Sequence, residues 1–250
     1  MKGFTGAWQI IQYNLRFYLA SLAGCLLVAF VLWRVPLPDW LRAVLVGFIA
    51  LAAGWTVSSV AVSYYIYDRS RLYRFDWARE MVPGPVNRWV NVHAGLDASS
   101  LALKRLFPEA QFLVLNIFDT RAMTEPAIKR ARRLTGSPVP ALEADFRALP
   151  VAGGSCDAAF VILAAHELRR ARAREAFFAE LHRLLAPGGR VLLVEHLRDA
   201  ANFLAFGPGA FHFLARSDWE RAVRGAGLGV CHEARITPFV HALLLAPEKP

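Results

Sequence analysis

The chain has little cysteine, and the few cysteines it has are far apart. Cys25, Cys156 and Cys231 are the three in 250 residues, and none forms a C-x-x-C pair. A disulfide framework or a cysteine-ligated zinc site needs recurring, closely spaced cysteines. The sequence therefore excludes both and fits a reducing compartment. It also lacks internal repeats and low-complexity tracts, which excludes a solenoid.

Lysine is also scarce, although positive charge is abundant. Lys and Arg together number 29 against 20 Asp and Glu, so the net charge is +9, and arginine supplies most of it. The arginines do not form a run interleaved with aromatic residues, which a nucleic-acid surface would favour. We therefore expect no nucleic-acid partner. Several arginines flank apolar segments, which suits an anionic membrane surface better.

Charge is missing from two long runs near the N-terminus. Residues 17–33 would span about 26 Å as a helix, and residues 43–67 are long enough to cross a bilayer with tilt. The break between them holds Pro36 and Pro38. No small-x-small cleavage site follows the first run, which argues against a signal peptide. We expect residues 1–80 to be a membrane anchor with two transmembrane helices; a buried hairpin of a soluble protein is the alternative.

The distribution of basic residues predicts the orientation of this anchor. Basic residues are more frequent outside the two runs than in the turn between them, and such residues favour the cytoplasmic side. We therefore expect a multi-pass protein of the inner (cytoplasmic) membrane with its C-terminal domain in the cytoplasm. The residues counted are Arg69, Arg71, Arg74 and Arg79 after the second run, Lys2 and Arg16 before the first, and Arg34 and Arg42 between them.

After a Pro- and Gly-containing linker at 82–85, apolar runs alternate with amphipathic segments. This alternation predicts an α/β fold with a doubly wound sheet over residues 85–250. A capping box of Ser217 and Glu220 predicts the start of the last helix. The expected strands are 88–93, 111–116, 139–143, 157–163, 189–196, 228–236 and 240–246, and the expected helices are 98–106, 123–134, 171–185 and one from Ser217.

The segment 180–189 reads E-L-H-R-L-L-A-P-G-G, and a buried apolar run then leads to Glu195 and His196. This order of helix, P-G-G turn, strand and acidic strand end resembles the signature of class I S-adenosylmethionine-dependent methyltransferases, in particular the ubiquinone/menaquinone methyltransferase-like branch. The resemblance implies a Rossmann-like sheet with an antiparallel last strand, and S-adenosyl-L-methionine as cofactor. The alternative is an αβ turn in another doubly wound protein.

The glycine loop of that family is only partly present. The family's first strand ends in acid-x-G-x-G-x-G, and the matching residues 91–97 read N-V-H-A-G-L-D. Gly95 keeps its glycine, whereas His93 and Asp97 replace the other two and Asn91 replaces the acid. The resemblance implies that His93, Gly95 and Asp97 line the cofactor site.

Three further strand ends complete the implied cofactor site. Asn116 stands where the family has a ribose-binding acid; its amide can still bond a hydroxyl, and Asp119 is close enough to serve instead. The segment E-A-D-F-R-A-L-P resembles the family's G-D-A-x-x-L-P, which implies that Asp145 contacts the adenine amino group and Phe146 packs on the ring. Ala164 joins the site by the same resemblance. A loop-capping role is the alternative for Asp145.

Histidines are expected at three neighbouring strand ends. His93, His166 and His196 should lie there, with Glu167 and Glu195 beside them. Such a group can supply a general base, a metal site of imidazole and carboxylate, or only hydrogen bonds within loops. We expect His166 to be the base, with His196 or Glu195 next, and we assign no residue to a metal.

The stretch 202–214, N-F-L-A-F-G-P-G-A-F-H-F-L, lies where related enzymes place a substrate lid. Ordinary packing, an interfacial patch and the wall of an apolar pocket are all possible. We expect a membrane-anchored methyltransferase that acts on a small lipophilic acceptor, quinone-like or lipid. The alternatives are a catalytically silent methyltransferase-like membrane scaffold and a metal or hydrolytic enzyme on the same fold. The oligomeric state stays open.

Overall fold

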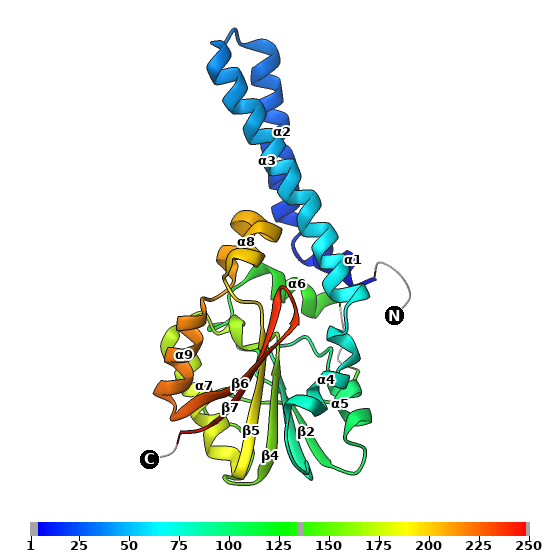
Figure 1. Cartoon of the computed structure of the whole chain (residues 1–250), viewed down its shortest axis with the longest axis vertical. Coiled ribbons are helices and arrows are strands. Elements are labelled where there is room, and N and C mark those ends of the chain that lie inside the picture. The colour runs from blue at the N-terminus through cyan, green and yellow to red at the C-terminus, as the bar shows by residue number, and fades with distance from the viewer. Residues whose placement is uncertain (1–4, 135–137, 249–250) are drawn as a thin grey trace.

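The computed structural model describes residues 5–134 and 138–248, so Lys2 lies outside the described part. These residues form a seven-stranded sheet in the order β3-β2-β1-β4-β5-β7-β6, with β7 antiparallel to both neighbours (Figure 1). This confirms the expected doubly wound sheet with an antiparallel last strand. The strands are β1 (Arg88–His93), β2 (Gln111–Asn116), β3 (Leu142–Glu143), β4 (Cys156–Ile162), β5 (Leu185–Glu195), β6 (Leu228–Thr237) and β7 (Val240–Pro247).

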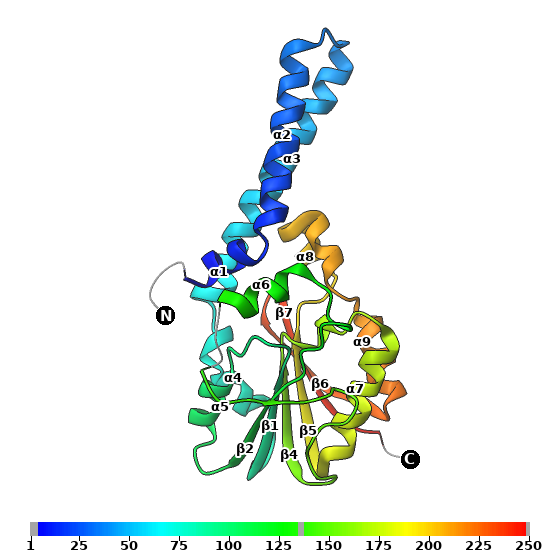
Figure 2. The same ribbon diagram turned by 180° about the vertical axis from the view of Figure 1, so that it is seen from behind.

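Helices cover both faces of the sheet (Figures 1 and 2). On one face lie α7 (Ala171–Leu184) and α9 (Arg216–Gly225), whose Phe177, Phe178 and Trp219 are fully buried. On the other lie α4 (Asp76–Met81) and α5 (Ser100–Leu106). The central strands are apolar on both sides, as two covered faces require. A further helix, α6 (Pro126–Leu134), lies over the carboxyl ends of the strands.

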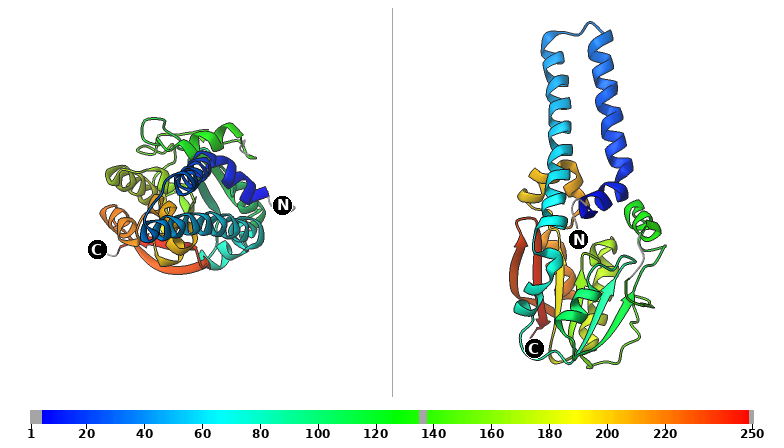
Figure 3. Two further views of the ribbon diagram at one scale, coloured as in Figure 1. Left: turned by 90° about the horizontal axis from the view of Figure 1, so that it is seen from above. Right: turned by 90° about the vertical axis from the view of Figure 1, so that its right-hand side faces the viewer.

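The N-terminal part forms a helical hairpin that extends away from the sheet domain (Figure 3). It consists of a short α1 (Thr5–Tyr13), then α2 (Leu15–Arg34) and α3 (Asp39–Tyr64), which ends in a π-helical turn at Tyr65–Arg69. By length and composition, α2 and α3 could each cross a membrane. Of the described residues, α2 buries none. The expected spans 17–33 and 43–67 lie within these helices, except that the second runs into the π-helical turn.

The segment after the hairpin packs into the sheet domain. Leu72, Phe75 and Trp77 are almost completely buried beneath the sheet, together with Val82. The Trp77 indole N–H donates to the carbonyls of Arg71 and Leu72 at 3.1 Å, which fixes its orientation. Residues 66–82 therefore pack with the sheet, whereas the sequence predicts an anchor that continues to residue 80.

Several expected boundaries are wrong, and three of them have a clear physical reason. The third strand has two residues in place of 139–143, because Pro138 and Pro140 lack the N–H that a ladder needs. Helix α7 ends at Leu184, and β5 is continuous from Leu185 through the P-G-G turn instead of starting at 189. Helix α9 starts at Arg216, since the Asp218 carboxylate accepts the N–H of Ala215 at 3.2 Å, so the expected Ser217 capping box does not form.

Candidate functional site

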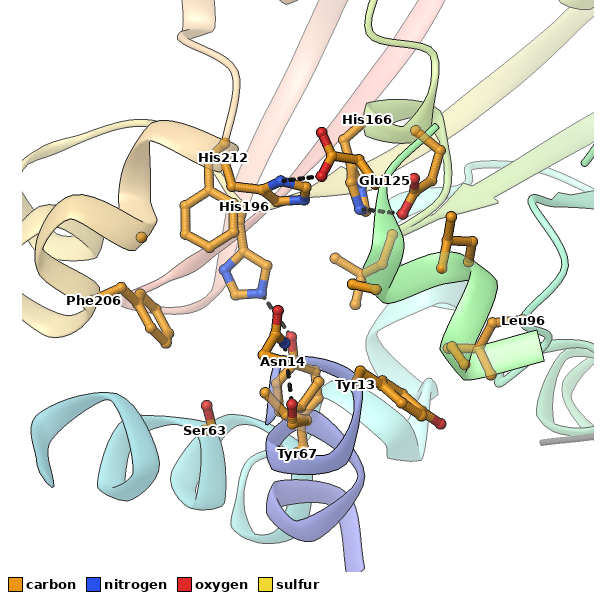
Figure 4. Close-up of a pocket in the computed structure, with 18 of the residues that line it drawn as sticks. Tyr13, Asn14, Ser63, Tyr67, Leu96, Glu125, His166, His196, Phe206 and His212 are labelled. Atoms are coloured by element: carbon orange, nitrogen blue, oxygen red, sulfur yellow. Dashed lines mark hydrogen bonds and ion pairs between the residues drawn. The ribbon is translucent and has the colours of Figure 1, made fainter. Parts of the chain in front are cut away.

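A cavity of about 470 Å³ lies between the hairpin base and the carboxyl ends of β1, β4 and β5 (Figure 4). A third wall comes from the stretch 202–214, which folds into α8 (Ala200–Phe206) and the 3-10 turns of Gly207–His212. In α/β proteins this edge of the sheet is where ligands bind. The hairpin contributes the lining residues Tyr13, Phe17, Tyr18, Ser59, Ser63 and Tyr67.

The polar lining of the cavity is acidic and histidine-rich. Although the whole chain carries a net charge of +9, no lysine or arginine occurs among the described residues that line the cavity. The buried carboxylates Glu167 and Glu195 have no arginine partner among the described residues, and they create a negative potential that favours a cationic ligand. The ionisable lining groups, apart from tyrosines, are Glu125, Glu167, Glu195, His166, His196 and His212.

His166 sits on a short 3-10 turn after β4 and is held between two carboxylates. Its Nδ1 lies 2.7 Å from Glu195 Oε2, its Nε2 lies 3.5 Å from Glu167 Oε1, and its backbone N–H donates to Glu195 at 3.2 Å. Burial opposes the charged form, but Glu195 and Glu167 outweigh it and raise the pKa of His166 to about 10. His166 is thus a cation at neutral pH, which contradicts its expected role as the free base.

His196 follows β5 and is neutral. Its Nδ1–H donates to the Phe239 carbonyl at 2.9 Å, because a carbonyl oxygen can only accept. Its Nε2 therefore carries the lone pair and accepts from the Tyr67 hydroxyl at 3.0 Å. Burial, and then the charge of His166, lower the pKa of His196 to about 4. The ring stacks on Phe213 with centroids 4.7 Å apart, so the Nε2 lone pair has a fixed direction.

His212 completes a group that the sequence analysis had not assembled. Its ring meets that of His166 edge to face, with centroids 5.6 Å apart, and its Nδ1 lies 4.0 Å from Glu125 Oε2. Burial and the His166 charge lower the pKa of His212 to about 4. Figure 4 shows the three histidines facing the cavity opposite Ser63 and Tyr67. Only the apolar lid-like stretch 202–214 hinted at His212; no signal pointed to Tyr67 or Glu125.

The stretch 202–214 forms a wall of the cavity, which agrees with one of its three expected roles. Phe206 and Phe213 line the cavity together with His212. Leu204 and Phe211 point outward and are 73% and 62% exposed. The same stretch therefore presents apolar side chains both to the cavity and to the outside.

The loop after β1 is closed by its own hydrogen bonds. Asp97 accepts the N–H groups of Ser99 and Ser100 at 3.1 and 2.9 Å and so starts α5. His93 Nδ1 accepts the N–H of Gly95 at 3.1 Å, and its buried Nε2 meets no partner in the described part of the chain. Burial lowers the pKa of His93. Replacing family glycines, His93 and Asp97 thus stabilise the loop itself.

Gly95 is the position in this loop where glycine is required. Its φ of +93° lies in the left-handed region, and an added Cβ would lie 2.4 Å from Cδ of Arg132. Arg132, an exposed residue of α6, covers the loop and places its guanidinium 3.9 Å from the centre of the Phe118 ring. The loop therefore contributes Ala94, Leu96, Ala98 and Ser99 to the cavity, and not the three residues expected there.

The expected ribose and adenine residues lie beyond the described cavity. The Asn116 amide donates to Glu143 Oε1 at 2.7 Å, so the acid at the end of β3 is next to the amide that replaces the family's acid. Asp119 and Asp145 both approach Arg147, at 3.9 and 3.2 Å. The Asp145 carboxylate also accepts the backbone N–H of Arg147 at 2.9 Å. This contact is the one that the loop-capping alternative for Asp145 predicts.

Phe146 and Ala164 are buried in the core. The Arg147 guanidinium lies 4.0 Å from the centre of the Phe146 ring and covers one of its faces, and Phe146 does not line the cavity. Its expected contact with adenine stays a prediction. Ala164 is also within the core, and its neighbour Leu163 lines the cavity instead. Leu163 has φ of +51°, a strained value for a branched residue, and such strain concentrates at functional sites.

The structure thus brings together His166, His196 and Glu195, the expected catalytic residues. None of the eight expected cofactor residues lines the cavity. In the ranges 5–134 and 138–248, no group of three or more histidine, cysteine or carboxylate side chains is arranged to hold a metal ion. The metal-site alternative therefore gains no support from the histidine group.

Comparison with known proteins identifies the sheet domain. Residues 94–193 match the family described as "Methyltransferase domain". Over 135 residues the chain is 27% identical to the ubiquinone/menaquinone biosynthesis C-methyltransferase of Syntrophotalea carbinolica. The aligned part is 54% of this chain and 54% of that relative, so the chain spans about half of the relative's length. The expected class I methyltransferase domain is therefore confirmed for the sheet.

Solved structures agree on the fold. A SAM-dependent methyltransferase from Aquifex aeolicus superposes with a TM-score of 0.52 at 16% identity, covering 71% of this chain and 93% of its own. A putative methyltransferase of Haloferax volcanii, solved with its Trm112 activator, gives 0.52 at 15% identity, covering 78% and 98%. At such identities the likeness concerns the fold alone.

Proposed function

We propose that this chain, whose sheet domain is a class I methyltransferase domain, transfers a methyl group from S-adenosyl-L-methionine to a lipophilic acceptor at the cytoplasmic face of a membrane. The observation that carries the proposal is the cavity itself. Catalytic-type side chains at the ends of two strands, β4 and β5, form one wall, and the turns of two apolar helices form the opposite wall. An acceptor that dissolves in a bilayer would meet both walls at once.

The residues present fit a cationic methyl donor. The cavity has carboxylates and no lysine or arginine among its described lining residues, and Glu167 Oε2 is buried without a partner in the described chain. A sulfonium would relieve both features. Ala94 and Leu96 of the β1 loop would border its amino-acid part, and Asp119 and Asp145 its adenosine. Arg132 is exposed and Arg147 is half-exposed, so both side chains can move aside.

S-adenosylmethionine supplies an electrophilic methyl group; the chain positions the acceptor and manages its proton. His196 Nε2 offers the fixed lone pair, but its low pKa makes it a weak base. The nearby His166 cation offsets this weakness, because it stabilises negative charge that develops on an acceptor oxygen or carbon. Tyr67, which donates to His196, would give way to the acceptor hydroxyl. These roles favour an acceptor with an acidic hydroxyl over an amine-bearing lipid.

The membrane part of the proposal rests on exposed apolar surface. Trp33, Leu27 and Val57 on α2 and α3 are between 64% and 73% exposed, a state that lipid tolerates and water does not. The arginines that follow α3 lie at the hairpin base beside the sheet domain, which suits a cytoplasmic domain. A reporter fused at Asp39 should be external and one at the C-terminus cytoplasmic; the opposite pattern would overturn the orientation.

Calorimetric titration of S-adenosylmethionine into the detergent-solubilised full chain tests the cofactor. We expect binding, and a five- to hundred-fold weaker affinity in Glu167→Gln, since a buried interaction is worth about 1–3 kcal/mol. Glu109→Gln is the matched control, because Glu109 is exposed between α5 and β2. Labelled methyl transfer to extracted membrane lipid tests the reaction. Absence of binding in the wild type would favour the silent scaffold.

A further inference from the structure

The two long helices carry a line of hydroxyl groups on the sides that face each other. The Tyr18 hydroxyl bonds Ser59 Oγ at 3.1 Å, and one turn further from the sheet Ser21 Oγ lies 3.4 Å from Thr56. Thr56, Ser59 and Ser63 are spaced by three and four residues, so they share one face of α3. In helices that are otherwise apolar, this face is an exception that an anchor does not need.

Ser63, the hydroxyl of this line nearest the sheet domain, has no hydrogen-bond partner among the described residues. It is 1% exposed, and its Oγ makes no hydrogen bond to any described residue, not even to the carbonyl one turn back as Thr56 does at 2.8 Å. An unpaired buried hydroxyl is unfavourable, and alanine would be a better helix former at this position. Its presence is explained if a ligand supplies the missing partner.

The hydroxyl line opens into the cavity. Tyr18, Ser59 and Ser63 line it from the hairpin side, and Tyr67, one turn after Ser63, reaches His196. The wall 202–214 closes the adjoining side against α3: Phe203 meets Trp55 with ring centroids 5.7 Å apart, and a Cβ on Gly207 would lie 2.4 Å from the Trp55 ring. The cavity therefore continues from the histidines to the facing sides of α2 and α3.

We infer that the hairpin is part of the acceptor site and selects the acceptor, with Ser63 donating a hydrogen bond to it. This inference rests on the proposed function and deepens it. The acceptor is an amphiphile whose reactive group lies at His166 and His196, with a second hydrogen-bond acceptor at Ser63. Its apolar chain lies along the lower turns of α2 and α3, beside Phe17, so the acceptor is delivered from the bilayer. Ser63, Ser59 and Tyr18 determine specificity and take no part in the chemistry.

The test uses the full chain in phosphatidylcholine nanodiscs, with the lipid extract of its host membranes as probe. Two readouts are measured: the rise in Tm on adding the extract, and incorporation of labelled methyl into it. Ser63→Ala should reduce the Tm rise and raise the KM for extracted lipid roughly five- to a hundred-fold at nearly unchanged kcat, as expected for one lost hydrogen bond. Ser63→Leu, which fills the space, should abolish both responses.

Ser58→Ala is the matched control, because Ser58 lies on α3 outside the cavity lining. It should behave as the wild type, and all three variants should bind S-adenosylmethionine equally. If Ser63→Ala and Ser63→Leu match Ser58→Ala in both readouts, the hairpin is an anchor only and the inference is wrong. If the wild type binds no S-adenosylmethionine, the proposed function fails; the Tm response to the extract still decides whether the hairpin wall binds lipid.

Discussion

Helices α2 and α7 use the same kinds of side chain in opposite ways. Helix α7 buries Phe177, Phe178 and Leu181 against the sheet and presents charged residues to water. Helix α2 is mostly apolar outside the hydroxyl line that faces α3 and, of its described residues, buries none. A helix that exposes so much apolar surface in its own chain is favoured by an apolar surrounding. The comparison teaches that the sheet domain buries its apolar side chains within the chain, whereas the hairpin leaves its own exposed, and this difference supports the proposed membrane surrounding.

The two regions meet in the segment that follows α3, which belongs to both. Ser63 and Tyr67 face the cavity, while Leu72, Phe75 and Trp77 lie under the sheet within the next ten residues. Shortening the chain from its N-terminus should therefore have little effect up to this segment and a large effect within it. The following predictions test where the division lies.

The largest effect is expected from truncation. A chain starting at Tyr65 should fold and stay in solution without detergent, whereas a chain starting at Val82 should aggregate. The second lacks Leu72, Phe75, Trp77 and Met81, whose burial completes one face of the sheet. Size-exclusion chromatography and circular dichroism of both chains measure this. Equal solubility would place the division near residue 80, as the sequence predicts.

Two tryptophans give the next largest difference. Trp77→Ala should lower the free energy of unfolding of the detergent-solubilised chain by about 3–5 kcal/mol, because the side chain is buried. Trp33→Ala should change it by less than about 0.5 kcal/mol, because Trp33 is 73% exposed on the hairpin. Denaturant titration followed by circular dichroism measures both. A comparable loss in both variants would mean that the hairpin packs in a way its exposure does not reveal.

The sheet side of the cavity should respond to pH in two opposite directions. The folded protein holds the proton of His166 more tightly than the unfolded chain does, since its pKa is raised to about 10. This contribution is fully present below pH 6.5, the ordinary value, and is lost as pH rises through about 10. For His196, with its pKa lowered to about 4, stability is present above pH 6.5 and lost as pH falls toward 4.

Denaturant titrations from pH 4 to 10 compare the wild type with His166→Gln and His196→Gln. His166→Gln should be less stable near pH 6 by roughly 3 kcal/mol, because it leaves two carboxylates without their cation, and the difference should shrink toward pH 10. His196→Gln should lose less stability than the wild type between pH 6.5 and 4. A constant difference across the range would mean that the two histidines have ordinary pKa values.

Much of the sheet could be predicted from the sequence because its signals are local. Buried strands appear in the sequence as apolar runs. The P-G-G turn in the segment E-L-H-R-L-L-A-P-G-G shows where helix α7 gives way to strand β5. The third strand could not be placed, because tertiary pairing with β2 and the prolines before it decide its length. Likewise Ala215, which has no capping side chain, starts α9 because Asp218 satisfies its N–H.

Less of the site could be predicted. His166, His196 and Glu195 were found because parallel strands bring their carboxyl ends together. The protonation states of these residues could not be predicted, because the pKa of His166 depends on the Glu195 carboxylate, which is 29 residues away in the sequence. Tyr67 and Ser63 reach the cavity because the base of the hairpin lies over the carboxyl ends of the strands, and no motif records that. The burial of Phe146 under Arg147 could not be predicted either, because a family motif gives a position and not the direction in which the side chain packs.

The smallest effects are expected at the outer edge of the site, where Arg147 lies between Asp119 and Asp145. If Asp145 contacts adenine, Asp145→Asn should weaken S-adenosylmethionine binding by about five-fold, the low end for a lost hydrogen bond, because the side chain is more than half exposed and water competes. Arg147→Ala separates this contact from mere loop capping. Arg147 now occupies the carboxylate that the cofactor would need, so removing it should strengthen binding a few-fold. Glu80→Gln, exposed and remote from the cavity, is the control. Calorimetric titration of the full chain measures all three. Weaker binding in Arg147→Ala together with normal binding in Asp145→Asn would mean that Asp145 only caps its loop and that Arg147 itself holds the cofactor.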